Sequence, residues 1–365
     1  MWTIPTLMTL TRIVAIPLIV GLFYLPLDMA TRNLWATVMF VVFALTDWLD
    51  GYLARKLNQT SAFGAFLDPV ADKFLVCASL LVLVHLGRAD VLVALHARRS
   101  APSVAAWAHA HPTHPLVLVL TGTDLYQDIQ HDADAQRSLQ LATHLVVLQE
   151  QGLQALPEAL RHKAHVIYQS STPLPPANKT QAHLRAVMVG HLRDEKSPQV
   201  LWQAAQALQA DDAIFIDHIG RSLDPTLATQ AQQTASQCPH YRWLNEMPSV
   251  PTRRSIQRAH VLVHTSRIEG GAHVIMEAVL SGTPVLASRV SGNVGMLGTD
   301  YPGYFEPGNA QQLAALLREC RQTQNQTDGL LAKLTHACQT RAALFQPERE
   351  QADLCALITS ALKPV

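Results

Sequence analysis

The sequence changes character near residue 88, and this change limits what the whole chain can fold into. Before that point, apolar runs are broken by a few charged residues, and the only histidine is His85. The other 16 of the 17 histidines lie from His96 onward, where short apolar runs alternate with helical stretches. A chain of 365 residues has room for about two or three domains. We therefore expect a domain boundary between Gly87 and Asp90.

Three apolar runs dominate the first part of the chain. Ile13 to Leu27 and Trp35 to Leu45 are each near the length that crosses about 30 Å of hydrocarbon, so they predict two membrane helices. The third run, Phe74 to Leu86, is about 20 Å long as a helix, and we expect it not to span. The lysines and arginines between the runs predict that this stretch faces the cytoplasm.

Four aspartates lie beside these apolar runs. Asp47 and Asp50 are three residues apart, and Asp68 and Asp72 are four apart, so on helices each pair projects from one face. Ionisable side chains near a membrane are costly unless they are paired or bound to metal. Four carboxylates predict a hard-oxygen site for one or two Mg²⁺ or Mn²⁺ ions. The alternative is a solvated, charged loop between helices.

Small residues beside the aspartates leave room for a nucleotide diphosphate. Gly51 and Ala54 keep the aspartate face clear, and Arg55 is placed to pair with phosphate oxygens. With Gly64, these positions complete an Asp-x-x-Asp-Gly-x-x-Ala-Arg block followed by Gly-x-x-x-Asp-x-x-x-Asp. About the first 86 residues thus resemble CDP-alcohol phosphotransferases, most closely the bacterial phosphatidylglycerophosphate synthases.

This resemblance implies a reaction for the first part. The four aspartates would hold two metal ions on the diphosphate of a CDP-linked lipid. Asp72 would be the base that activates an alcohol, with release of CMP. Members of that family have about six membrane helices, and the later ones have no counterpart after residue 86 of this sequence.

From Asp90 onward the pattern is that of an α/β protein. Short β-rich runs separated by helical stretches are followed by a loop with three prolines and a second α/β set that begins at Arg185. The expected strands of the first set are Val91 to Leu95, Leu116 to Leu120, His144 to Leu148 and His165 to Tyr168. We expect two Rossmann-like domains, an incomplete one over residues 89–178 and a second over 179–365, with a ligand between them.

A phosphate-binding loop is expected after the first strand of the second set. Gly190 permits a close backbone approach there, and Arg193 and Lys196 supply two cations beside a helix start. That combination suits a diphosphate. The alternative is an ordinary surface loop.

A second motif, HTSRIEGGAHVIMEAVLSGTPVLAS, follows the predicted strand Val261 to His264. We expect Gly270 and Gly271 to expose backbone amides at a helix start. Glu269 and Glu277 are eight residues apart, about two helical turns, so both are expected to face one cleft and accept sugar hydroxyls. The alternative is a pair of ordinary exposed glutamates.

These motifs resemble the donor domain of retaining glycosyltransferases of the GT-B class, which have two Rossmann domains. The resemblance implies that Glu269 contacts the donor sugar and acts catalytically, that Glu277 contacts the ribose, and that Arg193 and Lys196 hold the diphosphate. No metal or other cofactor is implied for this site. The stretches ADVLVALHARRSA, LVLTGTDLY, VMVGHLRDEKSP and EGGAHVIMEAV look like the selenosugar synthases of selenoneine biosynthesis, which use selenophosphate and a UDP-sugar.

That resemblance suggests an anionic acceptor. His96, Arg98 and Arg99 follow the first predicted strand, and Thr123 and Asp124 follow the second, so we expect these residues to bind the acceptor. The alternative is that Arg98 and Arg99 are simply solvated.

The leading hypothesis is a transferase fusion. It pairs a truncated membrane segment, residues 1–88, with a glycosyltransferase that moves a sugar from a UDP-sugar to a small anionic acceptor. The alternatives are phosphatidyl transfer from CDP-diacylglycerol to glycerol 3-phosphate, and a nonfunctional fusion fragment. Net charge is zero, which gives no reason to expect nucleic-acid binding. We expect attachment to a bacterial inner membrane with the second part in the cytoplasm, and a homodimer stays open.

Overall fold

The computed structural model describes residues 89–363 and, before them, positions 18, 21–23, 25, 27–28, 31–32, 34–39 and 41–42. The chain divides into two compact units, Met1–Asp90 and Val91–Val365. Within the described residues, no helix combines the length and the apolar character needed to cross a bilayer. The third apolar run and the predicted metal and diphosphate residues of the first unit lie outside the described residues: Asp47, Asp50, Gly51, Ala54, Arg55, Gly64, Asp68 and Asp72.

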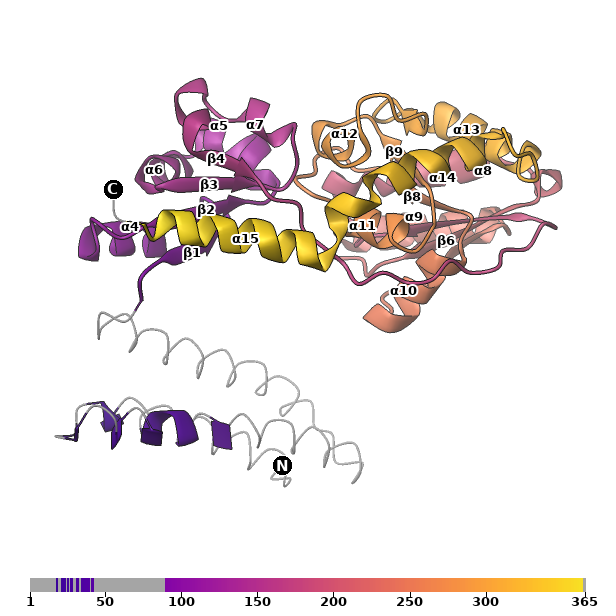
Figure 1. The fold of residues 1–365 in the computed structure, drawn as a ribbon. Helices are drawn as coiled ribbons and strands as arrows, with labels where there is room; N and C mark the ends of the chain where they lie inside the picture. The colour runs from indigo at the N-terminus through magenta and orange to yellow at the C-terminus, as the bar shows by residue number, and fades with distance from the viewer. Residues whose placement is uncertain are drawn as a thin grey trace. The chain divides into compact units, whose positions relative to one another are not determined.

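The second unit contains two parallel sheets, each at the centre of one lobe (Figure 1). The first lobe is built on a four-stranded sheet in the order β1-β2-β3-β4. Its strands are β1 (Leu92–Leu95), β2 (Leu116–Leu120), β3 (His144–Val147) and β4 (Ala164–Val166). Its connecting helices are α4 (Ala101–Ala110), η1 (Asp124–Asp128), α5 (Ile129–His131), α6 (Ala133–Leu141), α7 (Gly152–Ala155) and η2 (Glu158–Lys163).

The strand order of the first lobe decides where its helices lie. Each connection steps in the same direction across the sheet, and right-handed crossovers of that kind place their helices on one face. Trp107 of α4 and Leu139 of α6 are buried there. The opposite face of the sheet therefore needs another cover.

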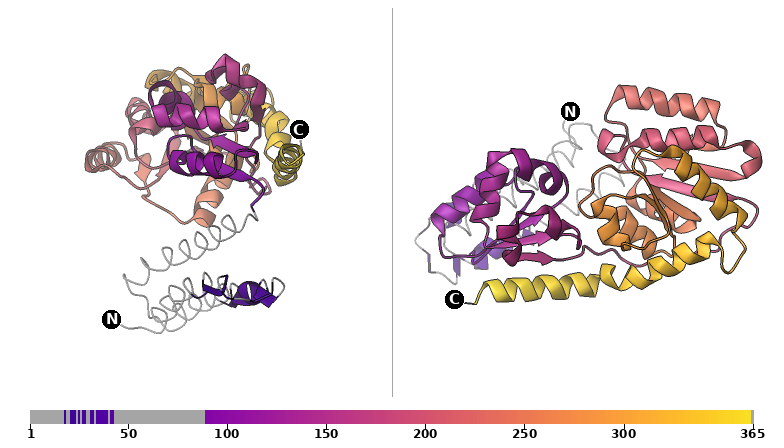
Figure 2. Two further views of the ribbon diagram at one scale, coloured as in Figure 1. Left: turned by 90° about the vertical axis from the view of Figure 1, so that its left-hand side faces the viewer. Right: turned by 90° about the horizontal axis from the view of Figure 1, so that it is seen from above.

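That cover is the last helix of the chain, α15 (Pro347–Ala361), which runs from the second lobe back along the first sheet (Figures 1 and 2). Leu357 of α15 packs in one apolar cluster with Val117 and Val146 of the sheet. The sequence-based division placed this helix with residues 179–365, but its apolar face packs on the first lobe. At the sheet edge, Val93 and Leu95 of β1 remain exposed.

The second lobe is a doubly wound sheet of six parallel strands in the order β10-β9-β8-β5-β6-β7. Its strands are β5 (Leu184–Val189), β6 (Ile214–Ile219), β7 (Tyr241–Trp243), β8 (Val261–His264), β9 (Val285–Ser288) and β10 (Tyr304–Phe305). Its helices are η3 (Asp194–Lys196), α8 (Pro198–Ala207), η4 (Ala210–Asp212), α9 (Pro225–Gln237), α10 (Ser249–Arg258), α11 (His273–Val279), α12 (Ser291–Leu297), α13 (Ala310–Gln322), α14 (Leu330–Arg341) and η5 (Ala342–Phe345).

The core of the second lobe explains why the central strands are so apolar. All four residues of β8 and of β9 are buried, because helices cover both faces of a doubly wound sheet. The expectation of α/β alternation with two parallel sheets is confirmed, and the fold is of the GT-B type. The strand expected over His165 to Tyr168 is instead found at Ala164–Val166, and Ile167 and Tyr168 begin the linker to β5.

Candidate functional site

The middle of the second sheet is a topological switch point. From β5 the chain winds toward β6 and β7, whereas β8, on the other side of β5, leads toward β9 and β10. In open α/β sheets, ligands bind at the carboxyl ends of the strands at such a point. Here the two loops at that position are residues 190–197 after β5 and residues 265–272 after β8.

These two loops bring Lys196 and Glu269 into direct contact. The Lys196 ammonium forms an ion pair with Oε1 of Glu269. The same carboxylate oxygen lies 3.1 Å from Nε2 of His264, the last residue of β8. Three ionisable side chains from two strand ends thus meet at the switch point.

Burial and charge set the protonation of this group. Burial alone would raise the pKa of Glu269, but the hydrogen bonds from His264 and Lys196 and the positive charge of Lys196 outweigh it and hold that pKa well below its usual value. Burial lowers the pKa of His264, against the opposing pull of the Glu269 carboxylate. At neutral pH we therefore expect an ionised Glu269 whose Oε1 accepts a hydrogen bond from the Nε2–H of a neutral His264.

The two loops are also joined through their backbones. The Thr265 hydroxyl donates to the Lys196 carbonyl at 2.6 Å, and the Arg267 amide donates to the Glu195 carbonyl at 2.8 Å. Ser197, directly before α8, has a left-handed backbone with φ of 44°. Non-glycine residues in that region store strain that often marks functional loops. These contacts fix Lys196 relative to the loop after β8.

Gly270 is not an exposed amide at a helix start, as the sequence suggested. It is buried, and α11 begins only at His273. A Cβ on Gly270 would lie 1.4 Å from the carbonyl oxygen of Thr121 in the first lobe. Glycine is needed because two backbones meet there, so this loop is a contact between lobes. Gly271 approaches Leu148 of the first lobe, where an added Cβ would lie 2.8 Å from the leucine Cβ.

The remaining predicted donor residues have different surroundings. Arg193 is exposed and has no ion-pair partner in the part of the chain that the structure describes. Glu277 of α11 lies 3.5 Å from Nε of Arg253 and 3.7 Å from Nδ1 of His273. The structure therefore joins Glu269 to Lys196 but gives Glu277 separate partners. Gly190 stays close to the lysine, because an added Cβ would meet the Lys196 side chain at 3.7 Å.

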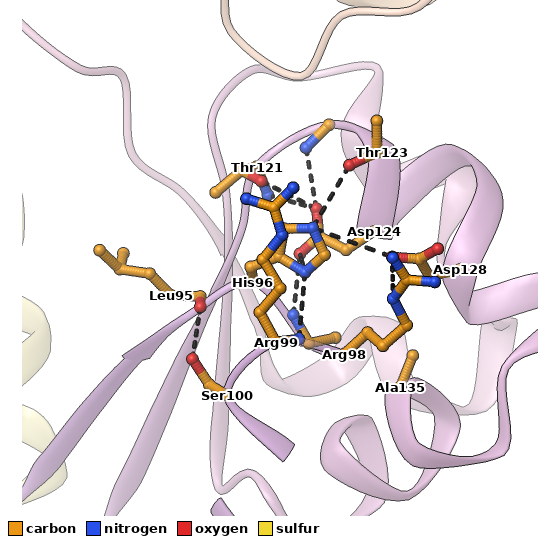
Figure 3. Close-up of polar contacts among 12 residues, drawn as sticks. Leu95, His96, Arg98, Arg99, Ser100, Thr121, Thr123, Asp124, Asp128 and Ala135 are labelled. Atoms are coloured by element: carbon orange, nitrogen blue, oxygen red, sulfur yellow. Dashed lines mark hydrogen bonds and ion pairs between the residues drawn. The ribbon is translucent and has the colours of Figure 1, made fainter. Parts of the chain in front are cut away.

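The predicted acceptor residues of the first lobe converge at the ends of β1 and β2 (Figure 3). Asp124 is fully buried, and its Oδ1 accepts from the backbone amides of Thr121 and Gly122 at 2.9 Å each. Its Oδ2 accepts from the Ala97 amide at 3.0 Å. Asp124 thus ties the loop after β2 to the loop after β1.

His96 lies over this carboxylate. Its Nδ1 is 3.9 Å from Oδ2 of Asp124, and its Nε2 is 3.3 Å from the Thr123 hydroxyl. The residue is buried and has a left-handed backbone with φ of 71°. Such a conformation costs on the order of 1 kcal/mol for a residue with a Cβ, and it persists here because the surrounding contacts hold it.

Asp128 completes the cluster, and the sequence reasoning missed it. Its Oδ2 is buried without a hydrogen bond and lies 3.4 Å from Nε of Arg98 and 3.8 Å from Nε2 of His96 (Figure 3). Asp124 and Asp128 share one turn of the π-helix η1, and π-helical turns are frequent at functional sites. Arg99 is exposed, and its backbone amide lies 3.4 Å from Nδ1 of His96.

Two more partners were also missed: His264 and Arg253. His264 had a signal, because a histidine that ends a buried strand at a sheet's carboxyl edge is well placed for a site. Arg253 had none, since it reaches Glu277 only through the tertiary fold. Among the described residues, no group of three or more histidine, cysteine or carboxylate side chains could hold a metal ion.

Two family models match separate parts of the chain. Residues 2–123 match the model described as CDP-alcohol phosphatidyltransferase, and residues 176–333 match the model described as glycosyl transferases group 1. The chain joins a CDP-alcohol phosphatidyltransferase segment to a group 1 glycosyltransferase domain. The first match extends past residue 86, where the sequence resemblance ended, and overlaps β1, α4 and β2 of the first lobe.

Relatives of the phosphatidyltransferase segment match over a shorter stretch. A CDP-diacylglycerol–glycerol-3-phosphate 3-phosphatidyltransferase of Wigglesworthia glossinidia brevipalpis is 51% identical over 82 residues, which are 22% of this chain and 44% of the relative. A chloroplastic/mitochondrial enzyme of the same description from Arabidopsis thaliana is 54% identical over 81 residues, 22% of this chain and 27% of the relative. The chain thus spans less than half the length of these curated relatives.

Solved structures resemble the glycosyltransferase part in fold. HepE of Anabaena in complex with UDP has a TM-score of 0.61 at 18% identity, covering 78% of this chain and 82% of HepE. Sucrose-phosphate synthase of Thermosynechococcus elongatus has a TM-score of 0.62 at 17% identity, covering 80% of this chain and 78% of the synthase. At such identities the likeness establishes the arrangement of two parallel sheets and leaves the substrates open.

Proposed function

We propose that the glycosyltransferase domain transfers a sugar from a UDP-sugar to a small anionic acceptor. The observation that carries the proposal is the Lys196–Glu269–His264 group at the switch point of the second sheet. A cation beside a carboxylate suits a nucleotide sugar, because the cation can neutralise the diphosphate while the carboxylate accepts sugar hydroxyls. HepE, which has the same fold, was solved with UDP.

The proposed reaction breaks the bond between the anomeric carbon and the diphosphate oxygen. UDP leaves with the electron pair, and Lys196 and Arg193 stabilise the developing charge. An acceptor atom then bonds the same carbon from the same face, so the anomeric configuration is retained. Glu269 orients the donor sugar, and Glu277 contacts the ribose. Gly190, Gly270 and Gly271 shape the backbone around the nucleotide.

The acceptor is proposed to bind at the first-lobe cluster. Arg98 and Arg99 supply cations at the end of β1, and His96 and Thr123 add hydrogen-bonding groups beside them. Asp124 holds the two loops in register rather than offering a free carboxylate. An oxyanion of the selenophosphate type is the proposed acceptor, which would make the product a selenosugar.

UDP binding tests the donor part of the proposal. Titration calorimetry of the full-length protein with UDP is expected to show binding that is lost in Glu277→Ala. An exposed acid such as Glu348 at the start of α15 serves as a control, since Glu348→Ala leaves the site intact. Absence of UDP binding in the wild-type protein rejects the donor assignment.

A second candidate function belongs to the first unit, and the identity of about one half to curated phosphatidyltransferases favours it. We infer that Asp47, Asp50, Asp68 and Asp72 hold Mg²⁺ or Mn²⁺, that Gly51, Ala54 and Arg55 face the diphosphate of a CDP-lipid, and that Asp72 is the base. The bound metal would supply charge stabilisation to the diphosphate.

Release of CMP from CDP-diacylglycerol in detergent tests this second function. Metal-dependent release in the wild-type protein, lost in Asp72→Asn, supports it, and no release with either metal removes it. If both halves fail their tests, the chain is a nonfunctional fusion. We propose three domains for the chain, residues 1–88, 89–178 and 179–365. The first would lie in a bacterial inner membrane and the other two in the cytoplasm.

A further inference from the structure

A pocket of about 470 Å³ lies in the second lobe beside the linker that joins the two sheets. It is lined by linker residues 179–181, by residues 324–326, by one side of α14, and by His260 and Pro284. No aspartate or glutamate lines it among the described residues, whereas Lys179, His260 and His336 do. The polar lining is otherwise made of amides and hydroxyls. A pocket with this lining favours an anion.

Lys179 is the cation best placed to bind that anion. Its Nζ donates to the Gly282 carbonyl at 3.2 Å and to the Thr283 hydroxyl at 3.3 Å. An ammonium has three donors, so one remains without a partner in the described part of the chain. Neither partner carries a charge, and a largely buried cation without a counter-charge is costly.

Lys163 is a lysine of the same molecule whose three ammonium donors all have hydrogen-bond acceptors. Its Nζ donates to three backbone carbonyls, those of Leu139, Gln140 and Ala142, at 2.9, 3.3 and 2.6 Å. Lys163 therefore uses all three donors at the end of α6 and does not line this pocket. Lys179 differs in having one free donor and an adjoining hollow.

The surroundings of Lys179 are positive as well. His260 already uses both ring nitrogens, since Nδ1 accepts from the Arg185 amide at 2.9 Å and Nε2 donates to the Thr180 carbonyl at 2.8 Å. Burial lowers the pKa of His260, and the charges of Lys179, His183 and Arg185 lower it further. Burial also lowers the pKa of Lys179 to about 8. Cationic side chains thus gather at this place, and no carboxylate among the described residues lines the pocket beside them.

We propose that this pocket binds a small phosphate-type oxyanion, free or as a phosphomonoester, through the ammonium of Lys179. The anion supplies the counter-charge that the protein lacks and accepts the third donor of the ammonium. Because Lys179 belongs to the linker and the facing wall belongs to α14, a bound anion ties the linker between the lobes to the second lobe. This site is separate from the donor residues at the switch point and does not depend on the proposed glycosyl transfer.

Competitive labelling of lysines tests the proposal on the unmodified chain. Full-length protein is treated with an amine-acetylating reagent at pH 8, alone or with inorganic phosphate or glycerol 2-phosphate, which has no amine, and acetylation is measured by peptide mass spectrometry. Chloride at equal ionic strength is the control. At an anion concentration about ten times its dissociation constant, labelling of Lys179 is expected to slow about tenfold. Lys163 and the exposed Lys333 report any general effect and are expected not to change.

The two anions distinguish the source of the phosphate. Protection by both assigns the site to free phosphate and its esters, and protection by glycerol 2-phosphate alone assigns it to phosphomonoesters. Equal labelling of Lys179 with and without either anion overturns the proposal. As a second measurement, Lys179→Arg is expected to retain phosphate-dependent thermal stabilisation and Lys179→Met to lose it. Stabilisation that persists in a folded Lys179→Met protein also overturns it.

Discussion

Lys196 carries the only ammonium that contacts Glu269 in the described structure. A neutral residue at position 196 therefore changes the net charge of the Lys196–Glu269–His264 group. We predict that Lys196→Gln lowers the kcat of glycosyl transfer, followed as UDP formation, about 10²-fold to 10³-fold. The reason is that one preorganised cation is lost where negative charge would develop on the diphosphate. Steady-state kinetics with a UDP-sugar measure this. Arg242→Gln is the matched control, since the exposed Arg242 of β7 also pairs with a carboxylate, that of the buried Asp217 on β6, outside the two loops at the switch point. Equal losses in both variants would contradict a specific role.

His218 makes the second lobe sensitive to acid. It is fully buried on β6 with Nδ1 2.9 Å from the Tyr241 hydroxyl, and burial lowers the pKa of His218 to about 4. Between pH 6.5 and 4 the unfolded chain therefore binds a proton that the folded protein does not. The free energy of unfolding falls as the pH drops through this window, by up to about 1.4 kcal/mol per pH unit from this residue.

Urea unfolding of the wild type and His218→Asn at pH 7, 6 and 5 checks this prediction. The variant is less stable at pH 7 because it loses packing, but its stability is expected to change less steeply with pH. The exposed His131→Gln is expected to retain the wild-type slope. A slope that is the same in all three proteins would show that His218 does not carry the effect.

At the scale of elements, α15 is the helix whose position matters most for the first lobe. Leu357 is 5% exposed and packs on Val117 and Val146, on the sheet face that the crossover helices leave open. We predict that Leu357→Ala lowers the free energy of unfolding of the first lobe by about 2–4 kcal/mol. Hydrogen exchange of β2 and β3 amides measures this. Thr359→Ala, on the exposed side of the same helix, is expected to change little.

The sequence predicted the strands better than the helices that cover them. Leu116–Leu120 and Val261–His264 are found where they were expected, because each is a short, largely apolar run that lies in the interior of its sheet. The packing of α15 on the first sheet was not predictable, since its partners lie about 200 residues away and depend on the crossover direction. The same holds for the π-helix η1, whose geometry depends on local packing and not on a residue pattern.

Local motifs predicted which residues belong to the site better than they predicted which of those residues contact one another. Lys196 and Glu269 were both singled out from their own loops, but their pairing required β5 and β8 to be neighbours in the sheet. Gly270 was singled out for the wrong physical reason, an exposed amide in place of a contact between backbones. Asp128 carried no signal apart from its spacing to Asp124.

At the scale of the whole second unit, the Gly270 contact fixes how closely the loop after β8, residues 265–272, approaches the first lobe. Arg341 of α14 adds a second contact, because Nη2 of its guanidinium lies 3.7 Å from Oε1 of Glu150 in the first lobe. These contacts bring the carboxyl ends of both sheets together. A transfer between a donor on one lobe and an acceptor on the other requires such an approach.

We therefore predict that Gly270→Ala lowers the turnover number but leaves UDP binding unchanged. Its Cβ would lie 1.4 Å from the Thr121 carbonyl oxygen, so the backbones must move apart. The expected kcat falls about 10²-fold, because reacting groups misplaced by about 1 Å lose that much. Calorimetric UDP affinity is expected to stay near the wild-type value, since Lys196 lies on the second lobe. Gly21→Ala, whose added methyl meets no atom of the described residues within 4 Å, is the control. Unchanged turnover in Gly270→Ala would mean that transfer does not need this contact.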